Sequence, residues 1–118
     1  MPTLIDSSIL FAYAFRKDAR HEQASEFLRQ FDNEHIVPAP ILTEVFYLTS
    51  DRVSYVHAVE MFTFIQRAFR IEALTASDMI RMEVIMREYK SAELDFADTA
   101  IMAVAERLNI TRVATFDH

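Results

Sequence analysis

Four acidic side chains lie where a metal-dependent reaction could take place: Asp6, Glu44, Asp98 and Asp117. Carboxylates that gather in one place repel one another and lose hydration, so a cluster is unfavourable unless a cation lies among them. Mg²⁺ and Mn²⁺ prefer oxygen ligands and often keep several waters. Two such ions can activate a water and stabilise the leaving oxygen in phosphodiester cleavage. The four acids therefore predict a metal site, provided that the fold brings them together.

The elements that would position these acids alternate between short apolar strands and amphipathic helices. Strands are predicted at residues 3–5, 35–37, 71–74 and 112–115. Helices are predicted at residues 9–14, 20–32, 40–50, 52–68, 80–89 (with capping residues at 75–78) and 96–108. This alternation indicates an α/β fold, with a parallel central sheet of about four strands flanked by helices and joined by right-handed crossovers.

Parallel sheets bind ligands at the carboxyl ends of their strands. Asp6 directly follows the first predicted strand, and Asp117 lies just beyond the fourth. Glu44 lies in the first turns of the helix after the second strand, and Asp98 in the first turn of the helix before the fourth. We therefore expect the four side chains to converge on one edge of the sheet.

Simpler roles remain open for each of these acids. Asp6 could cap the first helix, Glu44 could be a solvated surface residue, and Asp117 could be exposed near the chain end. Asp95 lies three residues before Asp98 and is the better cap for that helix, which leaves Asp98 for another role. Asp95 also remains open as an accessory ligand.

Composition narrows the chemistry further. The chain has no cysteine, which excludes disulfides and thiolate metal sites, and no glycine, which excludes glycine-rich phosphate-binding loops. The net charge of −6 argues against a simple DNA-coating module and suits a basic protein partner. No apolar run could span a bilayer and no secretory signal is present, so we expect a cytoplasmic protein with no membrane partner. No two histidines have metal-ligand spacing, so structural or exposed positions are expected for His21, His35, His57 and His118.

The order of the motifs resembles a known family. The segments are LIDSS at 4–8, ILTEVFYL at 41–48, LDFADTAIMAVAERLNI at 94–110 and VATFD at 113–117. Together they resemble the four motifs of PIN-domain nucleases, and within that family the VapC-type toxins of prokaryotic toxin–antitoxin pairs. By motif, the three main acids are Asp6, Glu44 and Asp98, and the fourth is Asp117. Ser7 or Thr115 matches the small hydroxyl residues beside them.

The resemblance implies a PIN-like fold and an endoribonuclease that depends on Mg²⁺ or Mn²⁺ and cleaves RNA. It also implies a homodimer and a cognate antitoxin protein. Because family members usually continue past the fourth acid, the single PIN-like domain over 1–118 would lack its C-terminal strand. The helices over 41–68 carry more apolar surface than one face needs, which would serve a dimer interface or an antitoxin groove. Arg16 and Lys17 could contact RNA phosphates.

Two other classes of function were weighed against the nuclease. A catalytically inactive PIN-like module would bind a protein partner and show no metal-dependent cleavage. A phosphotransfer receiver domain would need a phosphoacceptor Asp at the end of a middle strand and a Lys after the last strand. No Lys follows the fourth predicted strand here, so the receiver is the weakest of the three readings.

Overall fold

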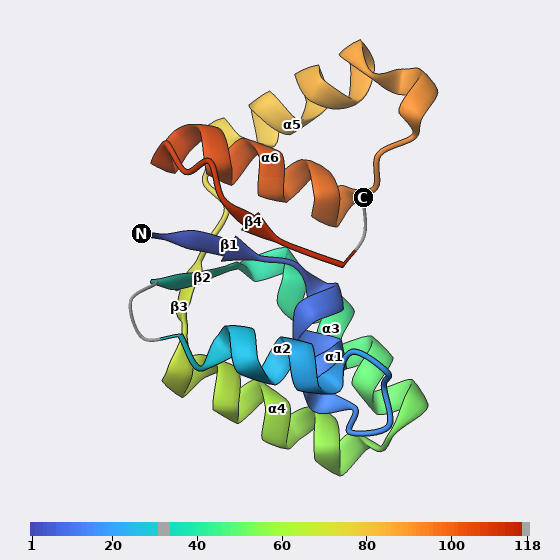
Figure 1. The fold of residues 1–118 in the computed structure, drawn as a ribbon. Helices are drawn as coiled ribbons and strands as arrows, with labels where there is room; N and C mark the ends of the chain where they lie inside the picture. Colours follow the sequence, from blue (N-terminus) through green and yellow to red (C-terminus); the bar gives the residue numbers. More distant parts are fainter. Residues whose placement is uncertain (31–33, 117–118) are drawn as a thin grey trace.

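The computed structural model describes residues 1–30 and 34–116, which form a central parallel sheet between layers of helices. The strand order is β3-β2-β1-β4, so β1 lies inside the sheet, next to β2 and β4 (Figure 1). The strands are β1 (Thr3–Ile5), β2 (His35–Pro38), β3 (Arg70–Glu72) and β4 (Val113–Ala114). The predicted α/β class and parallel sheet are confirmed.

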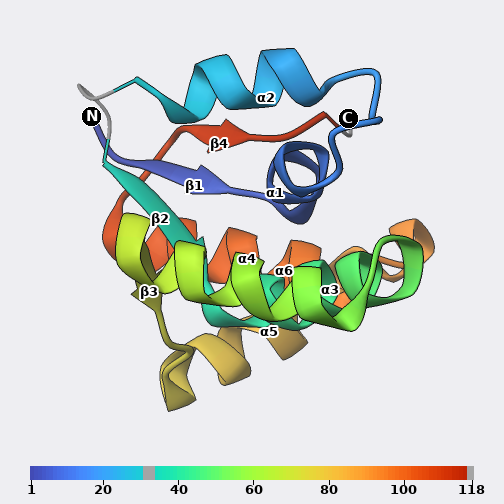
Figure 2. The ribbon, with the colours of Figure 1, turned by 90° about the horizontal axis from the view of Figure 1, so that it is seen from below.

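Helices connect each strand to the next. They are α1 (Ser7–Ala14), α2 (His21–Leu28), α3 (Ala39–Arg52), α4 (Tyr55–Ala68), α5 (Ala76–Glu88) and α6 (Phe96–Leu108), with a short 3₁₀ helix at Lys90–Ala92. Figure 2 shows α2 on one side of the strands and α3, α4 and α6 on the other. Within residues 1–30 and 34–116, no helix is both long enough and apolar enough to cross a bilayer.

Local sequence signals explain where several helices begin and end. At the start of α5, Thr75 Oγ1 accepts the amide of Asp78 at 3.0 Å, and Asp78 Oδ2 accepts the amide of Thr75 at 2.9 Å. Pro40 lies in the first turn of α3, where its missing amide proton is not needed. Asn109 ends α6 in the left-handed conformation, with φ of 56°. These three signals were readable in the sequence.

Some predicted boundaries were wrong by a few residues. The second helix ends at Leu28 instead of near residue 32, and residues 31–33 lie outside the described part of the chain. The fourth helix begins at Tyr55 instead of 52, because α3 continues to Arg52 and Ser54 Oγ caps the new helix. The third strand lies at Arg70–Glu72, where it pairs with β2, instead of at 71–74. This last boundary is set by the pairing of β3 with β2, which cannot be predicted from the spacing of apolar residues.

The core lies on both faces of the inner strands. Leu4, Ile5 and Val37 are completely buried, and they pack with apolar residues of α1, α3 and α6. Inner strands of a parallel sheet are covered on both faces, which explains why these strands are continuous apolar runs without alternation.

The amino ends of β1 and β2 carry two buried polar side chains, Thr3 and His35, which face each other in the strand register. We call this pair the amino edge. The His35 ring lies between Phe27 and Phe69, with ring centroids 5.4 Å and 5.7 Å away. Among residues 1–30 and 34–116, Thr3 Oγ1 and His35 Nε2 find no hydrogen-bond partner. Burial lowers the pKa of the His35 imidazole, so the ring is held neutral.

One arginine fastens α5 and α6 to the sheet. Arg107, in the last turn of α6, lies 2.9 Å from Asp78 Oδ1 and 2.9 Å from Glu72 Oε2, and also donates to the carbonyl of Ala73. Asp78 is almost fully buried, and its hydrogen bonds from Arg107 lower the pKa of the carboxyl. This contact fixes the end of α6 opposite to the turn that carries Asp98.

Candidate functional site

The sheet has a topological switch point beside β1. The chain adds β2 and then β3 on one side of β1, and returns to place β4 on the other. Ligands of open parallel sheets bind in the crevice outside the carboxyl ends of the strands at such a point. Asp6 follows β1 and Thr115 follows β4, so both flank this crevice. We call this end of the sheet the carboxyl edge.

Asp6 is buried at the carboxyl edge and is held by hydroxyl groups. Thr115 Oγ1 donates to Asp6 Oδ2 at 2.9 Å, and Ser8 Oγ donates to the same oxygen at 3.1 Å. Ser8 Oγ in turn accepts the amide of Phe116 at 3.0 Å. Asp6 occupies the N-cap position of α1, yet its side chain makes no capping hydrogen bond. Its carboxylate is therefore held by side-chain hydroxyl groups and caps no backbone amide of the helix.

Glu44 reaches the same region from α3. Ser7, which is buried in the first turn of α1, donates a hydrogen bond to Glu44 Oε1. This contact joins α1 to α3 and fixes the direction of the Glu44 carboxylate. Ser7 therefore orients Glu44, whereas Ser8 and Thr115 orient Asp6.

Asp95 and Asp98 complete the arrangement from the start of α6. Asp95 Oδ1 accepts the amide of Asp98 at 2.8 Å, which confirms Asp95 as the cap of this helix. Partial burial raises the pKa of the Asp98 carboxyl to about 6, and the negative charges of Asp95, Asp6 and Glu44 add to the shift. The four carboxylates thus act on one another, and we call Asp6, Glu44, Asp95 and Asp98 the acidic cluster.

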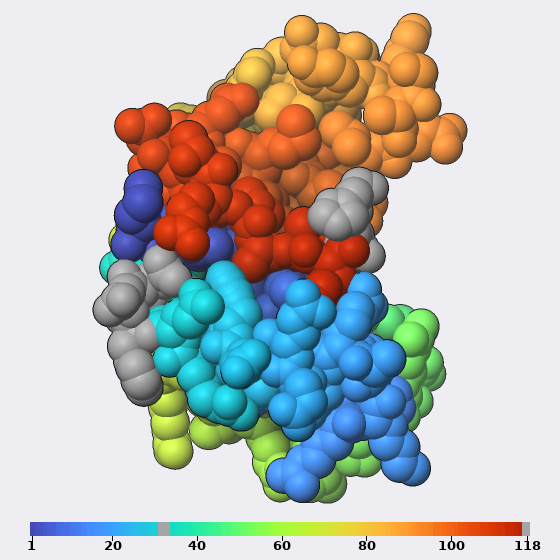
Figure 3. All heavy atoms as spheres, in the orientation of Figure 1, coloured from blue at the N-terminus to red at the C-terminus, as the bar shows by residue number. Residues whose placement is uncertain are grey.

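The structure does not describe Asp117, and it adds contacts of Ser8 and Arg20 that the sequence did not predict. Asp117 lies outside the described residues, so its place relative to the cluster stays a prediction. Sequence reasoning missed Ser8, although its position two residues after Asp6 was a usable signal. Arg20 is an exposed residue whose guanidinium lies 4.4 Å from the centroid of the Phe116 ring, a contact that the sequence does not predict. Figure 3 shows the C-terminal segment (red) against the N-terminal segment that carries this arginine (blue).

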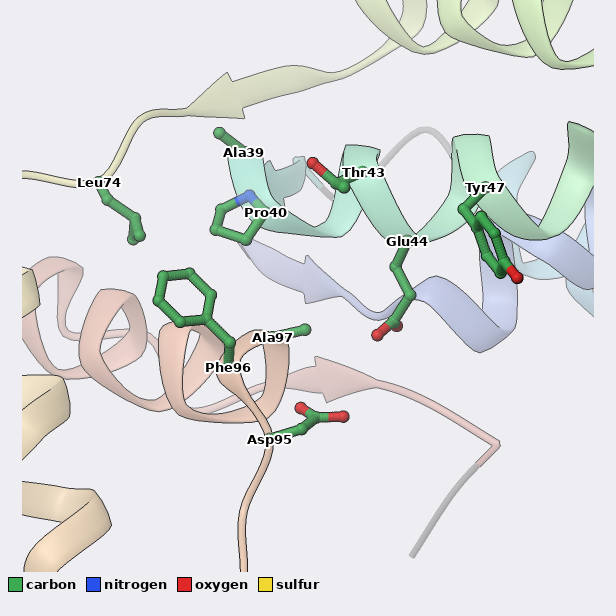
Figure 4. Close-up of a pocket in the computed structure, with 9 residues that line it drawn as sticks. All are labelled: Ala39, Pro40, Thr43, Glu44, Tyr47, Leu74, Asp95, Phe96 and Ala97. Atoms are coloured by element: carbon green, nitrogen blue, oxygen red, sulfur yellow. The ribbon is translucent and has the colours of Figure 1, made fainter.

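A cleft of about 750 Å³ opens beside the acidic cluster. Figure 4 shows the carboxylates of Glu44 and Asp95 pointing into this space from α3 and from the start of α6. The lining residues are Ala39, Pro40, Thr43, Glu44, Tyr47, Leu74, Asp95, Phe96 and Ala97. The cleft has the size of many sites for small ligands.

The donor set fits a hard divalent cation by type. All four side chains of the acidic cluster offer oxygen, and within the described ranges none of them forms an ion pair with a basic residue. The same part of the chain contains no ready-made group of three His, Asp or Glu side chains that could hold a metal. Mg²⁺ needs no such cage, because it is usually bound through one or two carboxylates, waters and substrate phosphates.

Comparison with known proteins identifies the family. The sequence model of the PIN domain matches residues 3–118. The chain belongs to the PIN-domain family.

Two solved VapC structures share this PIN fold. Mycobacterium tuberculosis VapC20, described as a toxin that cleaves the sarcin–ricin loop, superposes with a TM-score of 0.90 at 22% identity, covering 98% of this chain and 89% of its own. The other is the VapBC2 complex of Rickettsia felis, bound to a DNA fragment from its promoter. It gives a TM-score of 0.71 at 16% identity, covering 97% and 87%.

No curated protein matches the chain significantly. At these identities the two structures establish the PIN fold of this chain and leave its substrate open. The resemblance found in the sequence motifs is confirmed at the level of the family and of the fold.

Proposed function

We propose that this PIN domain is a VapC-like toxin, an endoribonuclease that hydrolyses RNA phosphodiester bonds with Mg²⁺ or Mn²⁺. The observation that carries this proposal is that the acidic cluster gathers carboxylates from three parts of the fold, with no basic partner among the described residues. In agreement, burial and the neighbouring negative charges raise the pKa of Asp98 to about 6. Carboxylates held together without a neutralising side chain are a site for a cation.

The metal ligands in this proposal are Asp6, Glu44 and Asp98, joined by Asp117 on the strength of its motif. The chemistry that a bound ion supplies is activation of a water and stabilisation of the leaving oxygen. The chain's own hydroxyl groups hold the ligands in place, since Thr115 binds Asp6 and Ser7 binds Glu44. Such supporting contacts typically change metal affinity or activity by about 10–100-fold when they are removed.

RNA binding by a chain of net charge −6 must depend on local groups. The metal ions would contact phosphate at the cluster, and Arg20 supplies a positive charge beside Phe116. Arg16 and Lys17 are exposed in the same loop between α1 and α2 and remain proposed phosphate contacts. These groups support RNA as the substrate without a broad basic surface.

A protein partner is the second part of the proposal. Side chains of α3 and α4 line an apolar groove of about 650 Å³, which includes Leu42, Phe46, Tyr55 and Phe62. Tyr47 also lines this groove, and Val56 and Val59 are exposed apolar residues of α4. We propose that an antitoxin, or a second copy of the chain in a homodimer, covers this surface. We also propose that the protein acts in the cytoplasm, where RNA is available.

A catalytically inactive interaction module is the alternative function. The lack of a ready-made three-ligand group in residues 1–30 and 34–116 favours it. Such a module would bind its protein partner through the groove of α3 and α4 but would neither bind Mn²⁺ nor cleave RNA.

The test is RNA cleavage by the purified protein with Mg²⁺, with Mn²⁺, and with excess EDTA. We expect cleavage that EDTA abolishes and that added Mn²⁺ restores. Asp98→Asn should lose the activity, whereas the matched exposed change Asp51→Asn should keep it. Equal cleavage with EDTA, or full activity of Asp98→Asn, would exclude the proposed mechanism.

A further inference from the structure

The cleft beside the acidic cluster has two chemically different ends. Figure 4 shows the carboxylates of Glu44 and Asp95 at one end, and the rings of Phe96 and Pro40 with the side chain of Leu74 at the other. The metal-binding role proposed above concerns only the acidic end. The apolar end therefore needs its own explanation.

Phe96 is the main side chain of this apolar end. It is the first residue of α6, directly after the cap Asp95, and 49% of it is exposed. Among the described residues, no other aromatic ring packs against it, whereas several other phenylalanines form ring pairs in or near the core. Its ring thus lines the cleft without being needed to fill the interior.

Exposed aromatic rings beside a phosphate-binding centre have a recurrent use in RNA recognition. Single-stranded bases are unstacked and then packed against aromatic side chains, and this stacking tolerates any base because each has a π-face. Here the ring of Phe96 shares one cleft with two members of the acidic cluster, Glu44 and Asp95. A nucleotide whose phosphate lies at the carboxylates could therefore place its base at the apolar end.

We propose that this apolar end is a binding site for one unstacked nucleobase of the RNA substrate, which stacks on Phe96 next to the scissile phosphate. This inference rests on the proposed nuclease function and adds the part of the substrate that is recognised there. It also predicts a preference for single-stranded or looped RNA, because a base inside a duplex cannot reach the ring.

A nucleobase explains this cleft better than an apolar peptide segment does. The cleft carries carboxylates at one end, where a base can donate an amino or imino N–H to an acceptor oxygen. Asp95 Oδ1 accepts the amide of Asp98, and an ionised carboxylate has further lone pairs that can accept such a donor. The neighbouring groove of α3 and α4 lacks carboxylates in its lining and suits a protein partner better.

The test combines a side-chain change with removal of single bases. A single-stranded RNA that the protein cleaves would be prepared with an abasic nucleotide at each position flanking the cut. For the unmodified chain, one of these changes should raise KM about tenfold, the size typical of one stacking contact. Phe96→Leu should raise KM by a similar factor on intact RNA, with kcat little changed, and should then be insensitive to the abasic nucleotide.

Two control variants make the result specific. Phe96→Tyr keeps an aromatic ring and should retain the KM of the unmodified chain. Tyr89→Leu removes a half-exposed aromatic ring from the end of α5, away from the cleft lining, and should also leave KM unchanged. Thermal unfolding of each variant checks that the fold is intact.

The outcomes separate this inference from the proposed function. The base site is wrong if the chain cleaves RNA but Phe96→Leu has an unchanged KM. It is also wrong if an abasic nucleotide raises the KM of Phe96→Leu as much as that of the unmodified chain. In both cases the proposed nuclease function stands. If Phe96→Leu loses only the binding of a protein partner, the cleft is a protein-docking site and the base site is again wrong. If no RNA is cleaved with Mn²⁺, both proposals fail together.

Discussion

At the amino edge of the sheet, Thr3 and His35 bury polar atoms that no described residue satisfies, whereas at the carboxyl edge the polar atoms are tightly partnered. Asp6 alone accepts hydrogen bonds from two hydroxyl groups. Both edges hold a group whose charged form is disfavoured, because burial lowers the pKa of His35 and raises that of Asp98 to about 6. Burial therefore disfavours a charged group at each end of the sheet.

The two edges differ in which groups surround the residue whose charge is disfavoured. Two aromatic rings pack against His35 and its burial keeps the imidazole neutral, so the amino edge contributes packing. Hydroxyl groups hold the carboxylates in place while their charges still oppose one another, so the carboxyl edge is prepared for a cation. We conclude that changes at the amino edge should alter stability, and that changes at the carboxyl edge should alter activity.

The largest expected effect is the loss of activity in Asp6→Asn. The amide keeps an oxygen that can accept from Thr115, but the negative charge is lost. We expect RNA cleavage to fall by about 10²-fold or more, because metal-ion stabilisation of a transition state is worth several kcal/mol. Initial rates at saturating Mn²⁺ measure the effect. Undiminished cleavage would remove Asp6 from the metal site.

Thr3→Val tests the opposite edge. It replaces a buried hydroxyl that has no described partner with a methyl group of similar shape. We expect the free energy of unfolding to rise by about 1 kcal/mol, since an unsatisfied polar group is removed from the interior. Urea denaturation measures the change, and RNA cleavage by the same variant should equal that of the unmodified chain. A loss of cleavage in Thr3→Val would contradict the claim that changes at the amino edge alter stability and not activity.

The metal-free protein should also gain stability from Asp98→Asn near pH 7. Folding raises the pKa of Asp98 from 3.8 to about 6, so the folded state binds a proton that the unfolded chain releases. Stability is therefore lost as the pH rises from about 4 to about 6. We expect a gain of about 1 kcal/mol at pH 7, reduced by solvent screening of this exposed residue, and none below pH 4. Equal stability at pH 7 would contradict the carboxylate repulsion.

His35 should give the reverse pH dependence. Its pKa is lowered below the usual 6.5, so the unfolded chain binds the proton more readily and stability is lost as the pH falls below about 6.5. Replacing the imidazole in His35→Gln should remove this part of the acid sensitivity, whatever its effect on stability at pH 7. Urea denaturation at pH 5, 6 and 7 gives the free energy of unfolding at each pH. If this free energy falls with pH as steeply in His35→Gln as in the unmodified chain, His35 is solvated.

The smallest expected effect concerns Arg20. If its guanidinium contacts an RNA phosphate, Arg20→Gln should weaken RNA binding a few-fold and reduce the slope of log affinity against log salt concentration by about 1. Arg29→Gln, at the exposed end of α2, is the matched control. An identical salt dependence for Arg20→Gln and the unmodified chain would exclude this contact.

Much of the fold could be predicted because local signals agree with the tertiary structure. The capping pair Thr75 and Asp78, Pro40 and Asn109 each mark a helix end in the sequence as in the structure. The order of strands and acids also placed the site at the carboxyl edge, since parallel sheets leave little choice there. The family match over residues 3–118 confirms the family that these motifs resemble.

Other features depend on contacts between distant segments and could not be predicted. Ser7 and Ser8 are neighbours in the sequence, yet one binds Glu44 and the other Asp6, because α1 passes between α3 and the end of β4. The stacking of Arg20 on Phe116 joins positions that no local pattern relates. The exposure of Phe96 could not be predicted either, because most other apolar residues of the same helix are buried.

Calorimetric titration of the metal-free protein with Mn²⁺ tests the central claim most directly. The carboxyl edge should bind Mn²⁺ saturably, Asp98→Asn should weaken that binding by about tenfold or more, and Asp51→Asn should leave it unchanged. If the unmodified chain takes up no Mn²⁺, or if all three proteins bind it equally, the acidic cluster is not a metal site.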